Sequence, residues 1–177
     1  MKLMKTLVLA GLVLAVAGGA QAQDIKVDFD KAANFGAIKT FSVKLGTSWG
    51  NPFGEKRVMD EVTGALAGKG WTLAPEDKAD AQVVVHGASQ TKHSLNTYYS
   101  GMGGYRWGGM GTATTTDTQY VVGTLLVDIF DAKGKNLIWR GIAQDEASNK
   151  TDKNIKKVSK AIEKLFKDFP PGSVTKK

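Results

Sequence analysis

Two segments of this chain carry apolar side chains at helical spacing on one side only, and they restrict the fold more than any other feature. The first opens with Asn51-Pro52, a capping residue followed by proline at the first helical position, and ends near Lys69 between two glycines. The second opens at Thr151 or Asp152, which we expect to cap it, and ends at Pro170-Pro171. The stripes are Val58, Met59, Val62, Ala65 and Leu66, then Ile155, Val158, Ile162, Leu165, Phe166 and Phe169. Both stripes are buried if the two helices lie on one face of a sheet.

The remaining apolar runs show the patterns of β-strands, which supply that sheet. The run of Val83, Val84 and Val85 suits a central strand covered on both faces. The expected strands are residues 24–29, 40–44, 81–89, 120–130 and 136–143, with a short extended piece at 71–73. Because the link between the first two is short, we expect them to pair. The sequence thus predicts an α+β two-layer sandwich in the order β-β-α-β-β-β-α, with a mostly antiparallel sheet of about five strands and two helices on one face.

Strand alternation places the neighbours Trp139 and Arg140 on opposite faces of the sheet. If the indole of Trp139 lies in the core, the guanidinium of Arg140 points outward and can pair with an acid of a neighbouring strand, such as Asp128. An exposed pair of this kind contributes about 0–1 kcal/mol to stability. We interpret both residues as structural.

The N-terminus has the features of a secretory signal. Lys2 and Lys5 precede an uncharged apolar run over residues 7–17, and Ala20-Gln21-Ala22 is the small-x-small pattern that a signal peptidase cleaves. The alternative is a membrane anchor, but a span needs about 18 apolar residues and this run is shorter. We expect cleavage after Ala22, which gives a signal at 1–22, a single domain at 23–171 and a flexible tail at 172–177. The expected location is the periplasm, with peripheral attachment to a membrane left open.

The chain has no cysteine, which excludes disulfides, thiolate chemistry and a thioether-linked lipid anchor. Removing residues 1–22 leaves 22 basic and 17 acidic residues, a net charge of +5. This charge favours anionic envelope surfaces, whereas the compartment disfavours nucleic acid. No second long apolar segment follows the signal, so no transmembrane segment is expected after its removal.

Residues 100–111 have the most unusual composition, because six of these twelve residues are glycine. The spacing fits neither phosphate-binding glycine pattern. The flanks can pair far out as a long hairpin with this loop at its tip. Four aromatic residues in and beside the loop form a possible contact loop for a partner: Tyr98, Tyr99, Tyr105 and Trp107. The alternative is a hairpin tip without function.

Lysines crowd the last helical segment and form a possible basic docking face for anionic lipid or polysaccharide. Its members are Lys153, Lys156, Lys157, Lys160 and Lys164. Most lysines of the segment fall opposite the apolar stripe, so the alternative is an ordinary solvated face.

Catalytic patterns are weak. His86 and His93 fall on opposite faces of an unbroken strand, and no cysteine or third histidine completes a zinc site. We expect no cofactor and no metal. The favoured hypothesis is a non-enzymatic binding or structural module that contacts an unknown envelope component, which can be protein, glycan or anionic lipid. The alternative is an envelope-directed hydrolase or transferase with its site near His86.

Several short pieces, in this order, resemble one bacterial envelope family of unknown function, the domain of unknown function 4136. They are Val27-Asp-Phe-Asp30, Phe35-x-x-Ile-Lys-Thr-Phe41, the helix opening Asn51-Pro52, Gly68-Lys-Gly-Trp71, residues 79–85, the glycine-aromatic loop, residues 123–131, Leu137-Ile-Trp-Arg-Gly141 and Phe169-Pro-Pro171. The resemblance implies an exported protein of Gram-negative bacteria without agreed catalytic residues. Many members look like lipoproteins, and this chain departs from them because it lacks the lipid-attachment cysteine.

Overall fold

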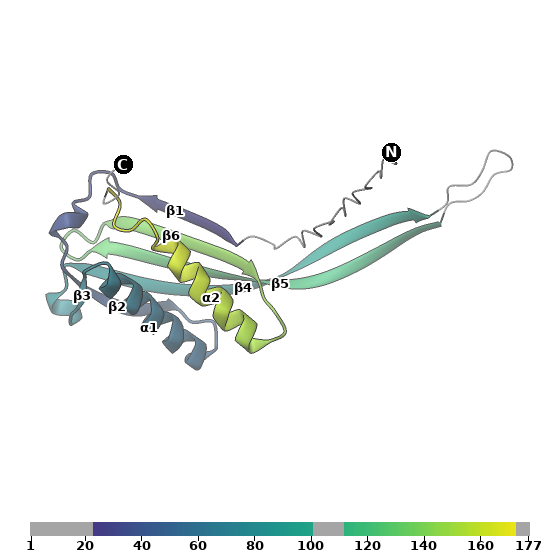
Figure 1. Ribbon diagram of the computed structural model, residues 1–177, viewed down its shortest axis with the longest axis horizontal. Helices are drawn as coiled ribbons and strands as arrows, with labels where there is room; N and C mark the ends of the chain where they lie inside the picture. Colours follow the sequence, from purple (N-terminus) through teal and green to yellow (C-terminus); the bar gives the residue numbers. More distant parts are fainter. Residues whose placement is uncertain (1–22, 101–111, 173–177) are drawn as a thin grey trace, which may run out of the picture.

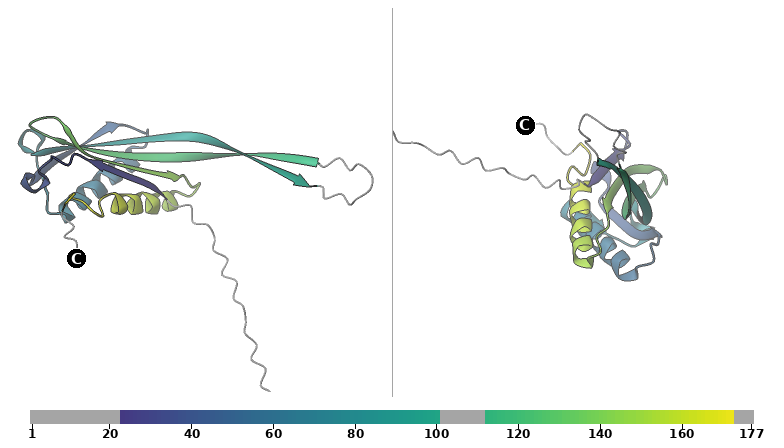
Figure 2. Two further views of the ribbon diagram at one scale, coloured as in Figure 1. Left: turned by 90° about the horizontal axis from the view of Figure 1, so that it is seen from above. Right: turned by 90° about the vertical axis from the view of Figure 1, so that its right-hand side faces the viewer.

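The computed structural model describes residues 23–100 and 112–172 and confirms the predicted α+β two-layer sandwich. One mixed sheet has the strand order β1-β6-β5-β4-β2-β3, and α1 and α2 lie side by side on one of its faces (Figures 1 and 2). The strands are β1 (Asp24–Phe29), β2 (Thr40–Thr47), β3 (Thr72–Leu73), β4 (Ala81–Ser100), β5 (Thr112–Asp131) and β6 (Leu137–Glu146). The helices are α1 (Pro52–Gly68) and α2 (Thr151–Leu165). The sheet has six strands rather than five because Thr72–Leu73 pairs with β2.

The expected pairing of the first two strands is wrong. β1 pairs antiparallel with β6 at one edge, whereas β2 lies parallel to β4 near the other edge. β1 and β2 are four strand spacings of about 4.8 Å apart. The ten-residue link between them can reach about 33 Å when extended, which is longer than this separation, so it can connect the two edges of the sheet. The crossing is favourable because it buries Phe35 and Ile38 in the core.

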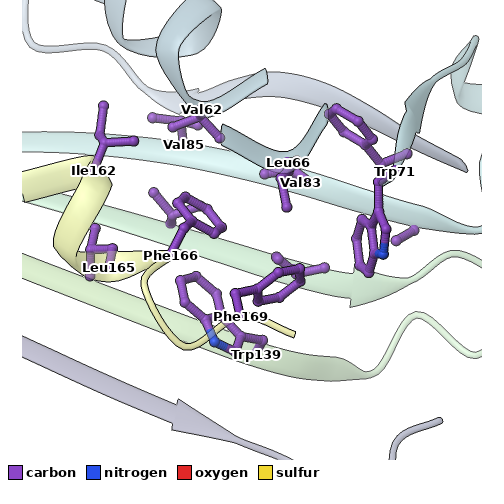
Figure 3. Close-up of a cluster of buried hydrophobic side chains, with 14 of the residues drawn as sticks. Val62, Leu66, Trp71, Val83, Val85, Trp139, Ile162, Leu165, Phe166 and Phe169 are labelled. Atoms are coloured by element: carbon purple, nitrogen blue, oxygen red, sulfur yellow. The ribbon is translucent and has the colours of Figure 1, made fainter. Parts of the chain in front are cut away.

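The two helical stripes form the core as the sequence predicts. Val62 and Leu66 of α1 and Ile162 and Leu165 of α2 are buried against the central strands. Beside them, an aromatic cluster closes the end of the sandwich around Phe169 (Figure 3). Its rings are Trp71, Trp139, Phe166 and Phe169, with centroids 5.1 to 5.6 Å apart for each pair in contact.

The start of α2 differs from the expectation. Its N-cap is Lys150, not Thr151 or Asp152, and no side chain caps the helix. The side chain of Asn154 instead holds the preceding turn, since its Oδ1 accepts from the Ser148 N–H at 2.7 Å and its Nδ2 donates to the Ser148 carbonyl at 2.7 Å. The first helical residue is therefore Thr151, one of the two residues expected to cap the helix.

The hairpin of β4 and β5 extends far beyond the rest of the sheet (Figures 1 and 2). Its ladder runs without a register shift from Ala81–Asp131 to Ser100–Thr112. β2 pairs with β4 only as far as His86, and β6 pairs with β5 only as far as Val122. Residues 91–100 and 112–121 therefore form a two-stranded arm. The sequence allowed the flanks of the glycine-aromatic loop to pair as a long hairpin, and the structure shows this pairing between β4 and β5.

Candidate binding cavity and arm

A cavity of about 370 Å³ lies between the sheet and the N-terminal halves of both helices, at the root of the arm. It forms because the helix-facing side chains of the sheet become small there. Toward the aromatic cluster, Val127 and Ile129 fill the space under the helices, whereas the cavity is lined by Gly87, Gly123 and Ala143. The walls come from the two helical stripes and from Leu125; those of the helices are Val58, Ile155, Val158 and Ala161.

Trp49 forms another wall and is held from two sides. Its indole lies directly on the backbone of Gly87, where a Cβ atom would collide with the ring. The buried carboxylate of Glu55 accepts hydrogen bonds from Ser48 Oγ at 2.6 Å, Trp49 N at 2.9 Å and Gly50 N at 3.1 Å. These donors, with Ser48 first, lower the pKa of Glu55. The charged carboxylate thus fixes the loop that carries the indole.

Polar side chains gather at the rim. Lys157 Nζ lies 2.9 Å from Asp145 Oδ1 and donates to the Glu146 carbonyl at 2.6 Å. Gln23 ties the start of β1 to α2, because its Nε2 donates to the Lys157 carbonyl at 2.7 Å and its Oε1 accepts from Lys164 at 3.0 Å. Arg57 of α1 also lines the cavity. Among the described residues it makes no hydrogen bond or ion pair.

The structure separates the two histidines from this cavity. His86 lies on the opposite face of β4, with its Nδ1 2.9 Å from Thr47 Oγ1, and it does not line the cavity. His93 lies in the arm, 3.2 Å from Asp117 Oδ2. Within residues 23–100 and 112–172, no cluster of three or more histidine, aspartate or glutamate side chains could hold a metal ion. No described constellation therefore joins His86 to a carboxylate.

The aromatic contact residues fall partly outside the described chain. Tyr98 and Tyr99 belong to the outer end of β4, whereas Tyr105 and Trp107 lie outside the described residues. Their contact role stays a prediction.

The five lysines of the docking face divide into two groups. Lys157 is half-buried at the cavity rim. The other four are exposed along α2: Lys153, Lys156, Lys160 and Lys164. The docking role of this face stays a prediction.

Sequence reasoning missed the cavity. The available signal was Gly87 and Gly123, each within a strand where glycine buries no side chain and weakens pairing. The sequence alone does not show that Gly87 and Gly123 both lie under the helices, because this depends on how β4 and β5 pair.

The fold and the site define a two-layer α+β domain with a lined cavity and a projecting two-stranded arm. The chain belongs to the family described as Domain of unknown function (DUF4136), which matches residues 25–171. This confirms the resemblance seen in the sequence. No curated protein matches the chain.

Two solved structures share the fold. A DUF4136 family protein from Bacteroides thetaiotaomicron has a TM-score of 0.55 at 16% identity, over 84% of this chain and 96% of that one. A PDZ domain protein from Parabacteroides distasonis has a TM-score of 0.57 at 14% identity, over 86% of this chain and 37% of that one. The chain therefore spans little more than a third of that second protein. At such identities the likeness shows the fold alone.

In the part of the chain that the structure describes, no helix is long and apolar enough to cross a membrane.

Proposed function

We propose that this protein is an exported, periplasmic, non-enzymatic binding module that holds a protein partner of the envelope through its arm. The observation that carries this function is the pairing pattern of the hairpin. Beyond His86 and Val122, neither strand of the arm has a further strand beside it among the described residues. The Val121 carbonyl accepts from the Ala147 N–H at 2.7 Å, and beyond it both outer edges offer backbone N–H and C=O groups to an added strand.

The composition of the arm supports a polypeptide partner over an anionic lipid surface. Among the twenty residues 91–100 and 112–121, the only lysine, arginine, aspartate or glutamate side chains are Lys92 and Asp117. Free sheet edges are usually protected by several charged side chains, and a lipid-binding surface would need several basic ones. Leu95 is 69% exposed and Val121 is 41% exposed, so the arm also offers apolar side chains.

The stability of the arm supports the same proposal. A two-stranded hairpin with no third strand and no helix against it is marginally stable in water. A ladder of ten residue pairs beyond Val122 gains stability when a partner strand covers one of its edges. Among the described residues the side-chain partner of His86 is the Thr47 hydroxyl and not a carboxylate, which favours this binding role over a hydrolase or transferase near His86.

Site-specific photocrosslinking tests the binding role. A photoreactive residue at Asn96 in the arm is expected to capture a discrete protein in intact envelopes, whereas the same residue at Gly64 on α1 is the matched control. Two redesigned hairpins locate the contact. In the loop-replaced protein, Asn-Gly takes the place of residues 101–111 between Ser100 and Thr112. In the arm-less protein, Asn-Gly takes the place of residues 91–121 between Gln90 and Val122. Both junctions connect positions that pair directly, so each closes a regular hairpin.

The partner is expected to bind the loop-replaced protein and to be lost from the arm-less protein, with thermal unfolding of the domain preserved. If the loop-replaced protein also loses the partner, the contact is made by the loop with Tyr105 and Trp107 and not by the strand edges. Retention by the arm-less protein, or equal crosslinking from Gly64, would contradict the proposal.

Cell fractionation tests the export. The full chain is expected to yield a periplasmic product whose N-terminal residue is Gln23, after removal of residues 1–22. A full-length product in the cytoplasm would contradict this part of the proposal.

A further inference from the structure

We infer that the cavity at the root of the arm is a binding site for a fatty acid, with the hydrocarbon chain between the helices and the sheet and the carboxylate at the mouth beside Arg57. This inference does not depend on the arm or on the proposed partner. It depends on the size of the cavity, on its lining and on the charges at its mouth.

The size and lining suit one hydrocarbon chain. Ligand pockets in proteins range from about 300 to 1,000 Å³, and the 370 Å³ of this cavity is at the small end of that range. At about 30 Å³ per water-sized group, it accommodates roughly a dozen groups, as in a single medium-length chain. Its inner surface combines side chains of both helical stripes with glycine and alanine of the sheet. Such a surface offers dispersion contacts to methylene groups. The polar side chains of Ser89, Thr124 and Asn154 also line the cavity.

The cavity is confined to one end of an otherwise filled interface. Deeper under the same helices, Val62, Leu66, Ile162 and Leu165 are at most 3% exposed. At the arm end, Ile155 and Val158 of the same stripe are only partly buried. No side chain enters the space from Gly123, where an added Cβ atom would meet nothing closer than the Asp145 carbonyl oxygen at 3.9 Å.

The charges at the mouth favour an anionic head group. Lys157 neutralises Asp145, so neither is free to bind a ligand ion. Arg57 lines the cavity and has no described partner, and its planar guanidinium binds a carboxylate with two hydrogen bonds. The N-terminal turns of α1 and α2 both border the cavity and add positive potential. Glu146 also lines it and opposes an anion.

Displacement of a dansyl-labelled fatty acid by dodecanoate, with the mature chain 23–177, tests the site. Saturable binding at one site per chain is expected. Gly123→Leu places a side chain in the cavity and is expected to weaken binding about tenfold or more, a loss of about 1.4 kcal/mol or more. The matched control is Gly64→Leu, an equal change on the exposed side of α1 with nothing within 4 Å. It is expected to leave binding unchanged.

Head-group specificity is tested with dodecanol and dodecyltrimethylammonium. Dodecanoate is expected to bind more tightly than either one. Arg57→Gln is expected to remove most of this preference and to leave dodecanol binding unchanged, whereas Glu146→Gln is expected to strengthen dodecanoate binding. Equal affinity for the cationic and anionic amphiphiles would overturn the assignment of Arg57.

Methyl NMR of the wild-type protein locates the site independently, so the test does not depend on whether the Gly123→Leu variant folds. Dodecanoate is expected to shift the methyl signals of Val58, Leu125 and Ile155, and to leave those of Val83 and Ile129 in place. Non-saturable binding, unchanged affinity of folded Gly123→Leu, or shifts spread over the whole core would each overturn the site. None of these results depends on the arm, so this inference and the proposed function fail separately.

Discussion

The guanidinium of Arg140 on β6 donates two hydrogen bonds to the carboxylate of Asp128 on the adjacent strand β5, from Nε to Oδ1 and from Nη2 to Oδ2, each 2.7 Å long. The two residues are directly paired in the ladder of β5 and β6. Trp139 is buried on the helix side, so the expected division of Trp139 and Arg140 between the two faces is confirmed. The pair is less exposed than expected, because the Asp128 side chain is only 5% accessible. The hydrogen bond to Asp128 raises the pKa of Arg140.

Arg140→Gln is expected to destabilise the fold by about 1–3 kcal/mol, because it leaves a buried carboxylate without its cationic partner. Adding Asp128→Asn to it should recover part of the loss, since an amide pair leaves no buried charge. Urea unfolding of the wild type, both single variants and the double variant measures the coupling as a double-mutant cycle. Additive losses would show that the two side chains act independently.

Glu55→Gln is expected to lower stability at neutral pH and to weaken the acid dependence of unfolding. The pKa of Glu55 is lower in the folded chain than its ordinary value, because the Ser48 hydroxyl and the backbone N–H groups of Trp49 and Gly50 donate to the carboxylate. Its stabilisation is therefore complete above the ordinary value and is lost as pH falls through the lowered one. Thermal unfolding from pH 7 to pH 2 should give a smaller decrease for the variant. Glu163→Gln, an exposed change on α2, is the control.

Local patterns predicted the helices well because each stripe is set by residues three and four apart. Val58, Val62 and Leu66 needed no long-range information to be placed in the core. Strand partners are set by distant segments, which is why the pairing of β1 with β6 could not be read from a short link. The cavity depends on three elements at once, since Gly87, Gly123 and Ala143 line one site only after β4, β5 and β6 have paired.

Gly87→Ala is expected to destabilise the protein by about 1–3 kcal/mol, because its methyl group takes the space occupied by the Trp49 ring. The displaced indole should also change the cavity wall, which near-ultraviolet circular dichroism detects. Gly64→Ala is the matched control on α1 and should stabilise by about 0.5–1 kcal/mol through helix propensity alone. If Gly87→Ala unfolds at the wild-type temperature, the close contact of Trp49 with Gly87 is not present in solution.

Lys150→Asp is expected to stabilise the fold by about 0.5–2 kcal/mol, because α2 begins without a side-chain cap. Lys150 has the extended backbone that a capping residue adopts, with φ −105° and ψ 116°. A carboxylate there can accept from the free N–H groups of the first turn and lies at the positive end of the helix dipole. Lys160→Asp, an exposed change within the same helix, removes the same charge without capping and should be neutral or destabilising. Equal unfolding temperatures for the two variants would mean that the first turn of α2 gains nothing from a cap.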